Sequence, residues 1–134
     1  MDTNIENSAD PNEHSIITLA SIDQTHILLM GDATEKNELK LLANYRLPKI
    51  QILKVGHHGS QTSSSTTFIN EIRPQIALIS AGRNNVYHLP HPTTIQKLRA
   101  IHAKVYNTAD NHHINIEFND KGKTSYQIHT EKAS

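Results

Sequence analysis

One stretch of the sequence decides the fold, Ile50-Gln51-Ile52-Leu53-Lys54-Val55-Gly56-His57-His58-Gly59-Ser60. Its first six residues form a short apolar run that is typical of a buried strand. Two adjacent imidazoles follow, with a glycine on each side. The glycines allow the backbone to turn sharply and to approach a ligand closely, and neutral imidazole is the commonest metal ligand among protein side chains. We therefore expect a strand that ends in a metal-binding turn.

An aspartate stands at the end of a second apolar run. Residues 25–30 are short, apolar and β-branched, and Gly31 and Asp32 follow them. If the two runs are strands of one sheet, Asp32 and the histidine pair meet at one edge of it. A carboxylate together with imidazole nitrogen suits a divalent metal such as zinc or manganese. The alternative for Gly31-Asp32 is a simple turn or a helix cap.

Strands alternate with short helices along the rest of the chain, which predicts an α/β domain with its sites in the loops after the strands. A polar segment over residues 1–12 is expected to be a flexible terminus, so the predicted domain covers 13–130. Thr34 is a candidate N-cap. The expected strands are 15–20, 25–30, 50–55, 75–80, 104–107, 114–118 and 125–129, with a turn at 119–122. The expected helices are 35–44, 66–72 and 93–102.

Composition removes several classes of function. Thirteen Lys and Arg balance thirteen Asp and Glu, so the chain has no general cationic field for nucleic acid or an anionic membrane. Cysteine is absent, which excludes disulfides, thiolate zinc sites and cysteine nucleophiles. No stretch approaches the roughly 18 to 20 apolar residues of a membrane-spanning helix. We therefore expect a soluble chain. Its ten histidines are the compositional anomaly, and only their positions indicate which of them are more than surface residues.

Hydroxyl, amide and imidazole side chains accompany these histidines in the loops. Ser60, Thr62 and Ser63 are candidate hydrogen-bond donors to a phosphate, assisted by the start of the helix that follows them. Asn85 lies in a second loop and is a candidate substrate-binding residue. His91 lies between two prolines, where three roles are open: a helix cap, a donor to a metal ligand or a catalytic group.

The order of these motifs extends over residues 12–118. It consists of Asn12-Glu13-His14-Ser15, Gly31-Asp32, Leu53-Lys54-Val55-Gly56-His57-His58-Gly59-Ser60, Thr62-Ser63-Ser64-Ser65, Arg73-Pro74 and Ile79-Ser80-Ala81-Gly82-Arg83-Asn84-Asn85. This order resembles the metallo-β-lactamase-like domain at the C-terminal end of the ComEC competence proteins. The resemblance implies an αββα sandwich and a metal-dependent hydrolase of phosphodiesterase or nuclease type. It also implies DNA as the substrate during natural transformation, and a membrane-bound parent protein with this domain outside the bilayer.

The resemblance also implies ligands. Asp32 would be the carboxylate that bridges metals, and the pair His57-His58 would contain the last histidine ligand. Which of these two imidazoles binds metal stays open, because they face opposite sides if the strand continues through them. Relatives usually have a His-Pro pair after the tyrosine of the second loop. Leu89 stands at that point, so either His88 or His91 substitutes or the function is lost.

The main departure from the family is an absence. The His-x-His-x-Asp-His motif, which belongs to the N-terminal half of such a sandwich, is nowhere in these 134 residues. The chain thus resembles the second half of the domain, and two or three ligands are fewer than a hydrolytic site requires. We expect weak metal binding, little hydrolysis without the missing N-terminal half, and an apolar face that favours homo-oligomers. The alternative is a non-catalytic remnant or assembly module with weak metal or nucleic-acid binding.

Overall fold

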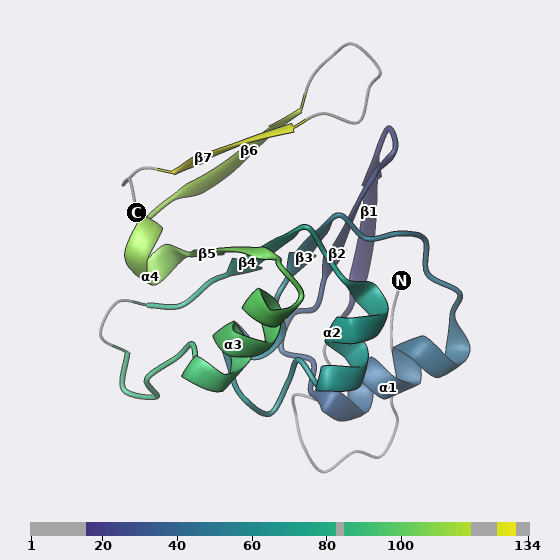
Figure 1. The fold of residues 1–134 in the computed structure, drawn as a ribbon, viewed down its shortest axis with the longest axis horizontal. Coiled ribbons are helices and arrows are strands. Elements are labelled where there is room, and N and C mark those ends of the chain that lie inside the picture. Colours follow the sequence, from purple (N-terminus) through teal and green to yellow (C-terminus); the bar gives the residue numbers. More distant parts are fainter. Residues whose placement is uncertain (1–15, 83–84, 119–125, 131–134) are drawn as a thin grey trace.

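The computed structural model describes residues 16–82, 85–118 and 126–130 (Figure 1). The predicted flexible terminus over residues 1–12 and the predicted turn at 119–122 lie outside these ranges. Within them, no helix has the length and apolar character needed to cross a bilayer.

A mixed sheet of five strands forms the centre of the molecule. β1 and β2 are antiparallel, and the other neighbouring pairs are parallel. The strand order is β1-β2-β3-β4-β5. The bounds are Thr18–Ile22 for β1, Thr25–Leu29 for β2, Ile52–Lys54 for β3, Ile76–Ile79 for β4 and Lys104–Asn107 for β5.

Helices connect the parallel strands and cover one face of the sheet (Figure 1). They are α1 (Glu35–Asn44), α2 (Thr66–Ile72) and α3 (Pro92–Ala100). A short helix, α4 (Thr108–Asn111), leads to a separate antiparallel pair, β6 (Ile114–Phe118) and β7 (Tyr126–Thr130). The predicted α/β class is confirmed: the described part of the chain is a partial α/β sandwich.

The core lies between the helices and the sheet. Alternate strand residues point to the helices, and each helix contributes buried apolar side chains to the same cluster. The members that are at most 1% exposed include Leu28, Met30, Leu53, Val55, Ala77, Ile79, Leu41, Phe68 and Leu98. This packing fixes the ends of β2, β3 and β4 relative to one another.

The opposite face of the sheet is only partly open. The strand register places Leu29, Lys54, Leu78 and Tyr106 in one row across β2 to β5. Leu29 is 38% exposed, whereas Ile52 and Ile76 on the same face are 0% and 8% exposed. The apolar face expected to pack against a missing half therefore stays a prediction.

Two strands differ from their predicted bounds by two or more residues at one end or both. β1 runs over residues 18–22 and not 15–20, because the hairpin turns later, at Asp23, which has a φ of 53°. β3 is limited to residues 52–54, because the chain leaves the sheet before Gly56. Helix α1 matches its prediction, with Thr34 as N-cap and its backbone N–H donated to Asn37 Oδ1 at 3.0 Å.

Gly59 offers a direct test of this backbone. Its φ is +80°, and a Cβ there would lie 2.5 Å from Pro90 Cβ. Gly59→Ala should therefore lower the free energy of unfolding by roughly 1–3 kcal/mol, measured by chemical denaturation. Gly82→Ala is the control, because the nearest atom to its Cβ is 4.0 Å away; it should change stability by less than about 0.5 kcal/mol. Equal losses would contradict this account of the turn.

Candidate metal centre

Three loops meet at one edge of the sheet. Because β2, β3 and β4 are parallel neighbours, the segments after Leu29, Lys54 and Ile79 leave the sheet on the same side. The loops are tied by backbone hydrogen bonds: His57 donates its N–H to the Gly31 carbonyl at 2.8 Å. The predicted meeting of the Gly31-Asp32 and Gly56-His57-His58-Gly59 motifs at one edge is what the topology produces.

The two histidines adopt a left-handed backbone conformation. φ and ψ are 52° and 43° at His57 and 54° and 27° at His58. Such a conformation costs roughly 1–2 kcal/mol for each residue that is not glycine. Strained backbone of this kind concentrates at functional sites, where the surrounding structure holds it in place. The strand therefore does not continue through the pair, and strand alternation does not decide where the rings point.

The two rings make different contacts. His58 donates its Nδ1–H to the Ser80 carbonyl at 2.6 Å, which leaves Nε2 as the unprotonated nitrogen of the neutral ring. That Nε2 lies 3.6 Å from Oδ1 of Asp32, and both side chains are 51% exposed. His57 instead forms a hydrogen bond through Nδ1 with Thr62 Oγ1 at 3.0 Å. The structure thus places His58 beside Asp32.

The Asp32–His58 pair has the geometry of two ligands of one cation. Bonds of about 2.0–2.1 Å to a tetrahedral zinc place neighbouring ligand atoms roughly 3.3 Å apart. The observed 3.6 Å is close to this separation, and the Nδ1–H bond to a backbone carbonyl is the usual support of a metal-binding histidine. The described residues contain no group of three or more side chains suited to holding a metal ion. These two residues fit part of a metal site.

His91, at the start of α3, forms hydrogen bonds with the same loop. It is the N-cap residue of α3, but its side chain forms no cap hydrogen bond. Its Nδ1 accepts the N–H of Gln61 at 2.9 Å, and its own N–H is donated to the Gly59 carbonyl at 3.0 Å. Since Nδ1 accepts, the neutral ring carries its proton on Nε2. His91 therefore presents an Nε2–H hydrogen-bond donor fixed beside the histidine turn.

Two of the three predicted phosphate donors, Ser60 and Ser63, are buried and form hydrogen bonds within the loop. Ser63 is fully buried and donates its hydroxyl to the Gly56 carbonyl at 2.8 Å. Ser60 is 6% exposed and shares a hydrogen bond with Thr62 Oγ1 at 3.0 Å. Thr62 alone of the three is exposed. Because the Ser63 hydroxyl is used inside the loop, we keep only Thr62 as a candidate for contact with a substrate.

Asn85 closes the second loop. Its Nδ2 donates to the carbonyls of Gly82 and Leu89, and its Oδ1 accepts the N–H of Leu89, each at 2.8 Å. These bonds use both donors of the amide and one acceptor site of its oxygen. Asn85 therefore shapes the loop, and its substrate contact stays a prediction.

A buried carboxylate that sequence reasoning missed accepts hydrogen bonds from the loop that precedes α2. Glu38, on α1, is fully buried and accepts the N–H of Ser64 and, at 2.9 Å, the N–H of Ser65. These amides come just before α2, so Glu38 places its carboxyl group beside the helix start that was expected to receive a phosphate. Burial raises the pKa of Glu38 to about 7, against the lowering effect of the hydrogen bonds from Ser65 and Ser64.

Sequence comparison connects this arrangement with competence proteins. Over 86% of the chain, 39% of residues are identical to Recombination protein 2 of Haemophilus influenzae, and the match covers 14% of that protein. ComE operon protein 3 of Bacillus subtilis is 33% identical over 84% of the chain and 15% of its own length. Competence protein ComA of Neisseria gonorrhoeae is 34% identical over 74% of the chain and 14% of its own length. No family model matches the chain.

The chain is related to the ComEC competence proteins. It spans about one seventh of the length of these curated relatives, so it corresponds to a small part of a ComEC-type protein. The relationship predicted from the Leu53–Ser60 block is thereby confirmed. The activity, substrates and partners of the whole ComEC-type proteins do not follow from it.

The raised pKa of Glu38 predicts a pH dependence of stability. The folded protein binds the Glu38 proton more tightly than the unfolded chain, in which the ordinary value of 4.5 applies. The free energy of unfolding should therefore be highest below pH 4.5 for this group and fall as pH rises to about 7, by up to about 1.4 kcal/mol per pH unit. Chemical denaturation between pH 5 and pH 8 measures this decline.

Glu38→Gln is the matched variant, because glutamine has the same shape and does not titrate. It should flatten the decline of stability between pH 5 and pH 8. A slope of equal size in the variant would show that another group causes it. Glu71→Gln, an exposed carboxylate on α2, should leave the slope unchanged.

Proposed function

We propose that this chain contributes one half of a metal-dependent phosphodiesterase centre that acts on DNA during uptake. The observation that carries the proposal is the 3.6 Å approach of His58 Nε2 to Asp32 Oδ1, with Nδ1 of the same ring held by the Ser80 carbonyl. The kinship with competence proteins supports the setting in DNA uptake. The hydrolytic activity is proposed from the chemistry of the pair.

The proposed roles follow from the hydrogen bonds. Asp32 and His58 would hold a zinc or manganese ion, which when bound would polarise a phosphodiester oxygen. Thr62, exposed and bonded to His57, would donate a hydrogen bond to the substrate. His91 would stabilise the leaving oxygen by a hydrogen bond from its Nε2–H, because its Nδ1 accepts the Gln61 N–H.

The centre would need ligands from elsewhere. A catalytic zinc requires about three protein ligands besides its open position, and this pair supplies two. The partly exposed face with Leu29 and Leu78 lies on the side of the sheet away from the helices. A second half that packed on this face would bring its own ligands to the edge. In the absence of that half, the same face would favour self-association.

Nuclease assays with manganese or zinc test this proposal. The chain alone should show no cleavage of single-stranded DNA above background, whereas the chain extended at its N-terminus through a His-x-His-x-Asp-His motif should cleave. In the extended protein, Asp32→Ala and His58→Asn should each lower the rate by at least roughly 100-fold. His57→Asn is the control, since asparagine tolerates the left-handed backbone; it should retain activity and metal content.

Two results would defeat the proposal. Enzyme-like cleavage by the chain alone, lost in Asp32→Ala, would show that the centre is complete without a second half. If the extended protein is inert and Asp32→Ala leaves its metal content unchanged, the hydrolase interpretation is excluded. In the second case the remaining candidate is a non-catalytic assembly module, which is favoured by the pairing of only two ligand side chains in the described residues.

A further inference from the structure

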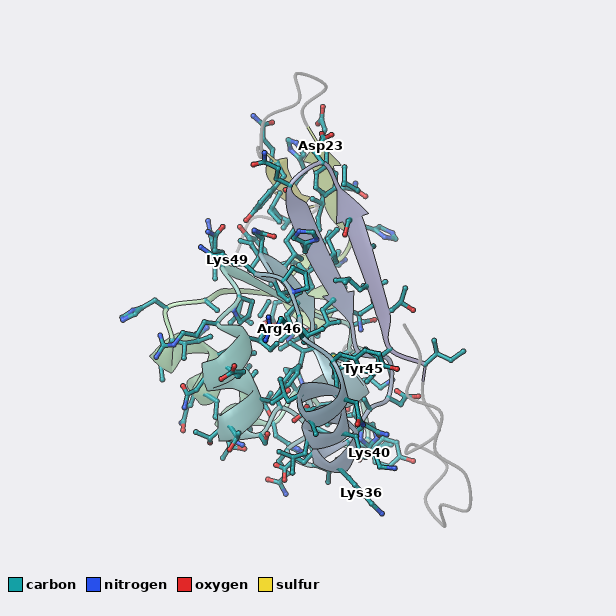
Figure 2. The ribbon with its side chains drawn as sticks, turned by 90° about the vertical axis from the view of Figure 1, so that its right-hand side faces the viewer. Asp23, Lys36, Lys40, Tyr45, Arg46 and Lys49 are labelled. Carbon is teal, nitrogen blue, oxygen red and sulfur yellow. The ribbon has the colours of Figure 1, made fainter. Side chains whose placement is uncertain are left out.

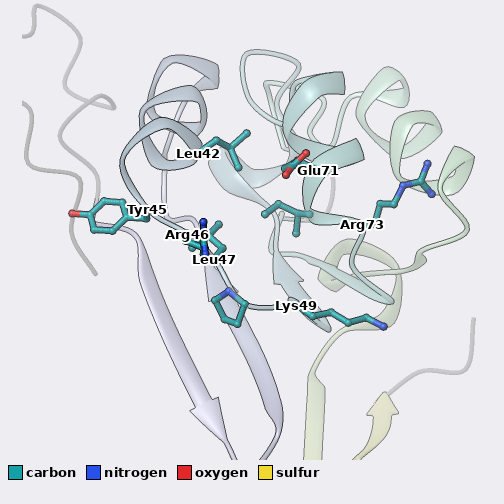
Figure 3. A pocket seen from close by; sticks show the side chains of 9 residues that line it. Leu42, Tyr45, Arg46, Leu47, Lys49, Glu71 and Arg73 are labelled. Atoms are coloured by element: carbon teal, nitrogen blue, oxygen red, sulfur yellow. The ribbon is translucent and has the colours of Figure 1, made fainter.

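A basic pocket lies at the opposite end of β3 from the candidate metal centre. It is a cavity of about 600 Å³ between the connection from α1 to β3 and the C-terminal end of α2 (Figure 3). Leu42, Leu47 and Ile72 provide apolar walls. The metal centre begins where β3 ends, whereas this pocket is lined by residues that precede β3, so the two share no residue.

Three cationic side chains surround this cavity. Arg46 and Lys49 come from the connection to β3, and Arg73 follows α2 (Figure 3). Glu71 is the single carboxylate in the lining. Arg46, Lys49 and Arg73 are exposed and, within the described ranges, form no salt bridge. In a chain whose formal net charge is zero, this is a local concentration of positive charge.

The positive charge continues along α1. Figure 2 shows Lys36 and Lys40 on α1, then Tyr45, then Arg46 and Lys49, following one another along one face. Lys36 and Lys40 are four residues apart and therefore lie on the same side of the helix. Tyr45, directly after α1, is 43% exposed, and its ring points away from the apolar walls of the pocket (Figure 3). The face thus combines a row of cations with a partly exposed aromatic ring.

We propose that this face binds single-stranded nucleic acid, with the phosphates along Lys36, Lys40, Arg46 and Lys49, one base stacked on Tyr45 and another against the apolar walls of the pocket. Sequence-independent binding of single strands combines a positively charged path with aromatic rings on which bases stack. An unpaired base has an apolar face to place in such a pocket, whereas the bases of a duplex are stacked and paired. The proposal stands independently of the metal centre, because no residue is shared.

The face suits a strand better than an anionic membrane. Its apolar residues line a recess below the charged side chains, and Ile72 is buried. Peripheral membrane binding instead uses apolar side chains that project into the lipid beyond the cations. The recessed arrangement fits a ligand that inserts a flat group into the protein.

Fluorescence anisotropy with a labelled oligothymidylate tests the proposal on the full chain in EDTA, which removes any contribution of a metal. Arg46→Gln combined with Lys49→Gln should weaken binding about tenfold at low salt and reduce the salt slope by roughly 1.4, since each phosphate contact on a single strand contributes about 0.7. Arg99→Gln combined with Lys104→Gln removes two exposed charges elsewhere and should change neither quantity.

Variants of Tyr45 separate stacking from charge. Tyr45→Leu should weaken binding about tenfold, whereas Tyr45→Phe, which keeps the ring, should bind as the native chain does. Asp32→Ala should bind normally, so a failure of the metal centre is distinguishable from a failure of this face. The proposal is overturned if both double variants lose affinity equally, or if the chain binds phosphatidylglycerol vesicles and not the oligonucleotide. Far-UV circular dichroism checks that each variant folds.

Discussion

The left-handed turn at His57 and His58 is the constraint on which the rest of the candidate site depends. A continuing strand would send the two rings to opposite faces, whereas the turn sends one ring to Thr62 and the other to Ser80 and Asp32. The conformation is unfavourable for both residues and is held by bonds from outside, above all the His57 N–H to the Gly31 carbonyl. The backbone thereby selects which imidazole reaches the carboxylate.

The surroundings of the turn are organised by buried polar groups. Glu38 accepts the amides of Ser64 and Ser65 from below, Ser63 bonds to the Gly56 carbonyl, and His91 accepts the Gln61 amide from α3. Each group satisfies a loop amide or carbonyl that the sheet and helices do not pair. A loop so tied can present Thr62 and the ring of His58 with little freedom, which is what a preorganised site requires.

Much of the fold was predictable because it depends on local patterns. The apolar runs gave β2 to β5, Thr34 marked the start of α1, and Arg73-Pro74 marked the end of α2. The site was only half predictable. The motifs located Asp32 and the histidine pair at one edge, but the choice of His58 depends on the Ser80 carbonyl, 22 residues away. Glu38 gave no signal, because an acid on an amphipathic helix is usually solvated and its burial follows from tertiary packing.

The central claim is that His58, and not its neighbour, shares a cation with Asp32. Nitrogen-15 NMR of the histidine side chains in the full chain tests it most directly, before and after addition of zinc. The account predicts that the neutral ring of His58 is protonated on Nδ1, that zinc shifts its Nε2 resonance while that of His57 stays in place, and that Asp32→Ala removes the shift. A zinc-dependent shift at His57 with His58 unchanged, or a His58 shift that persists in Asp32→Ala, would contradict the account.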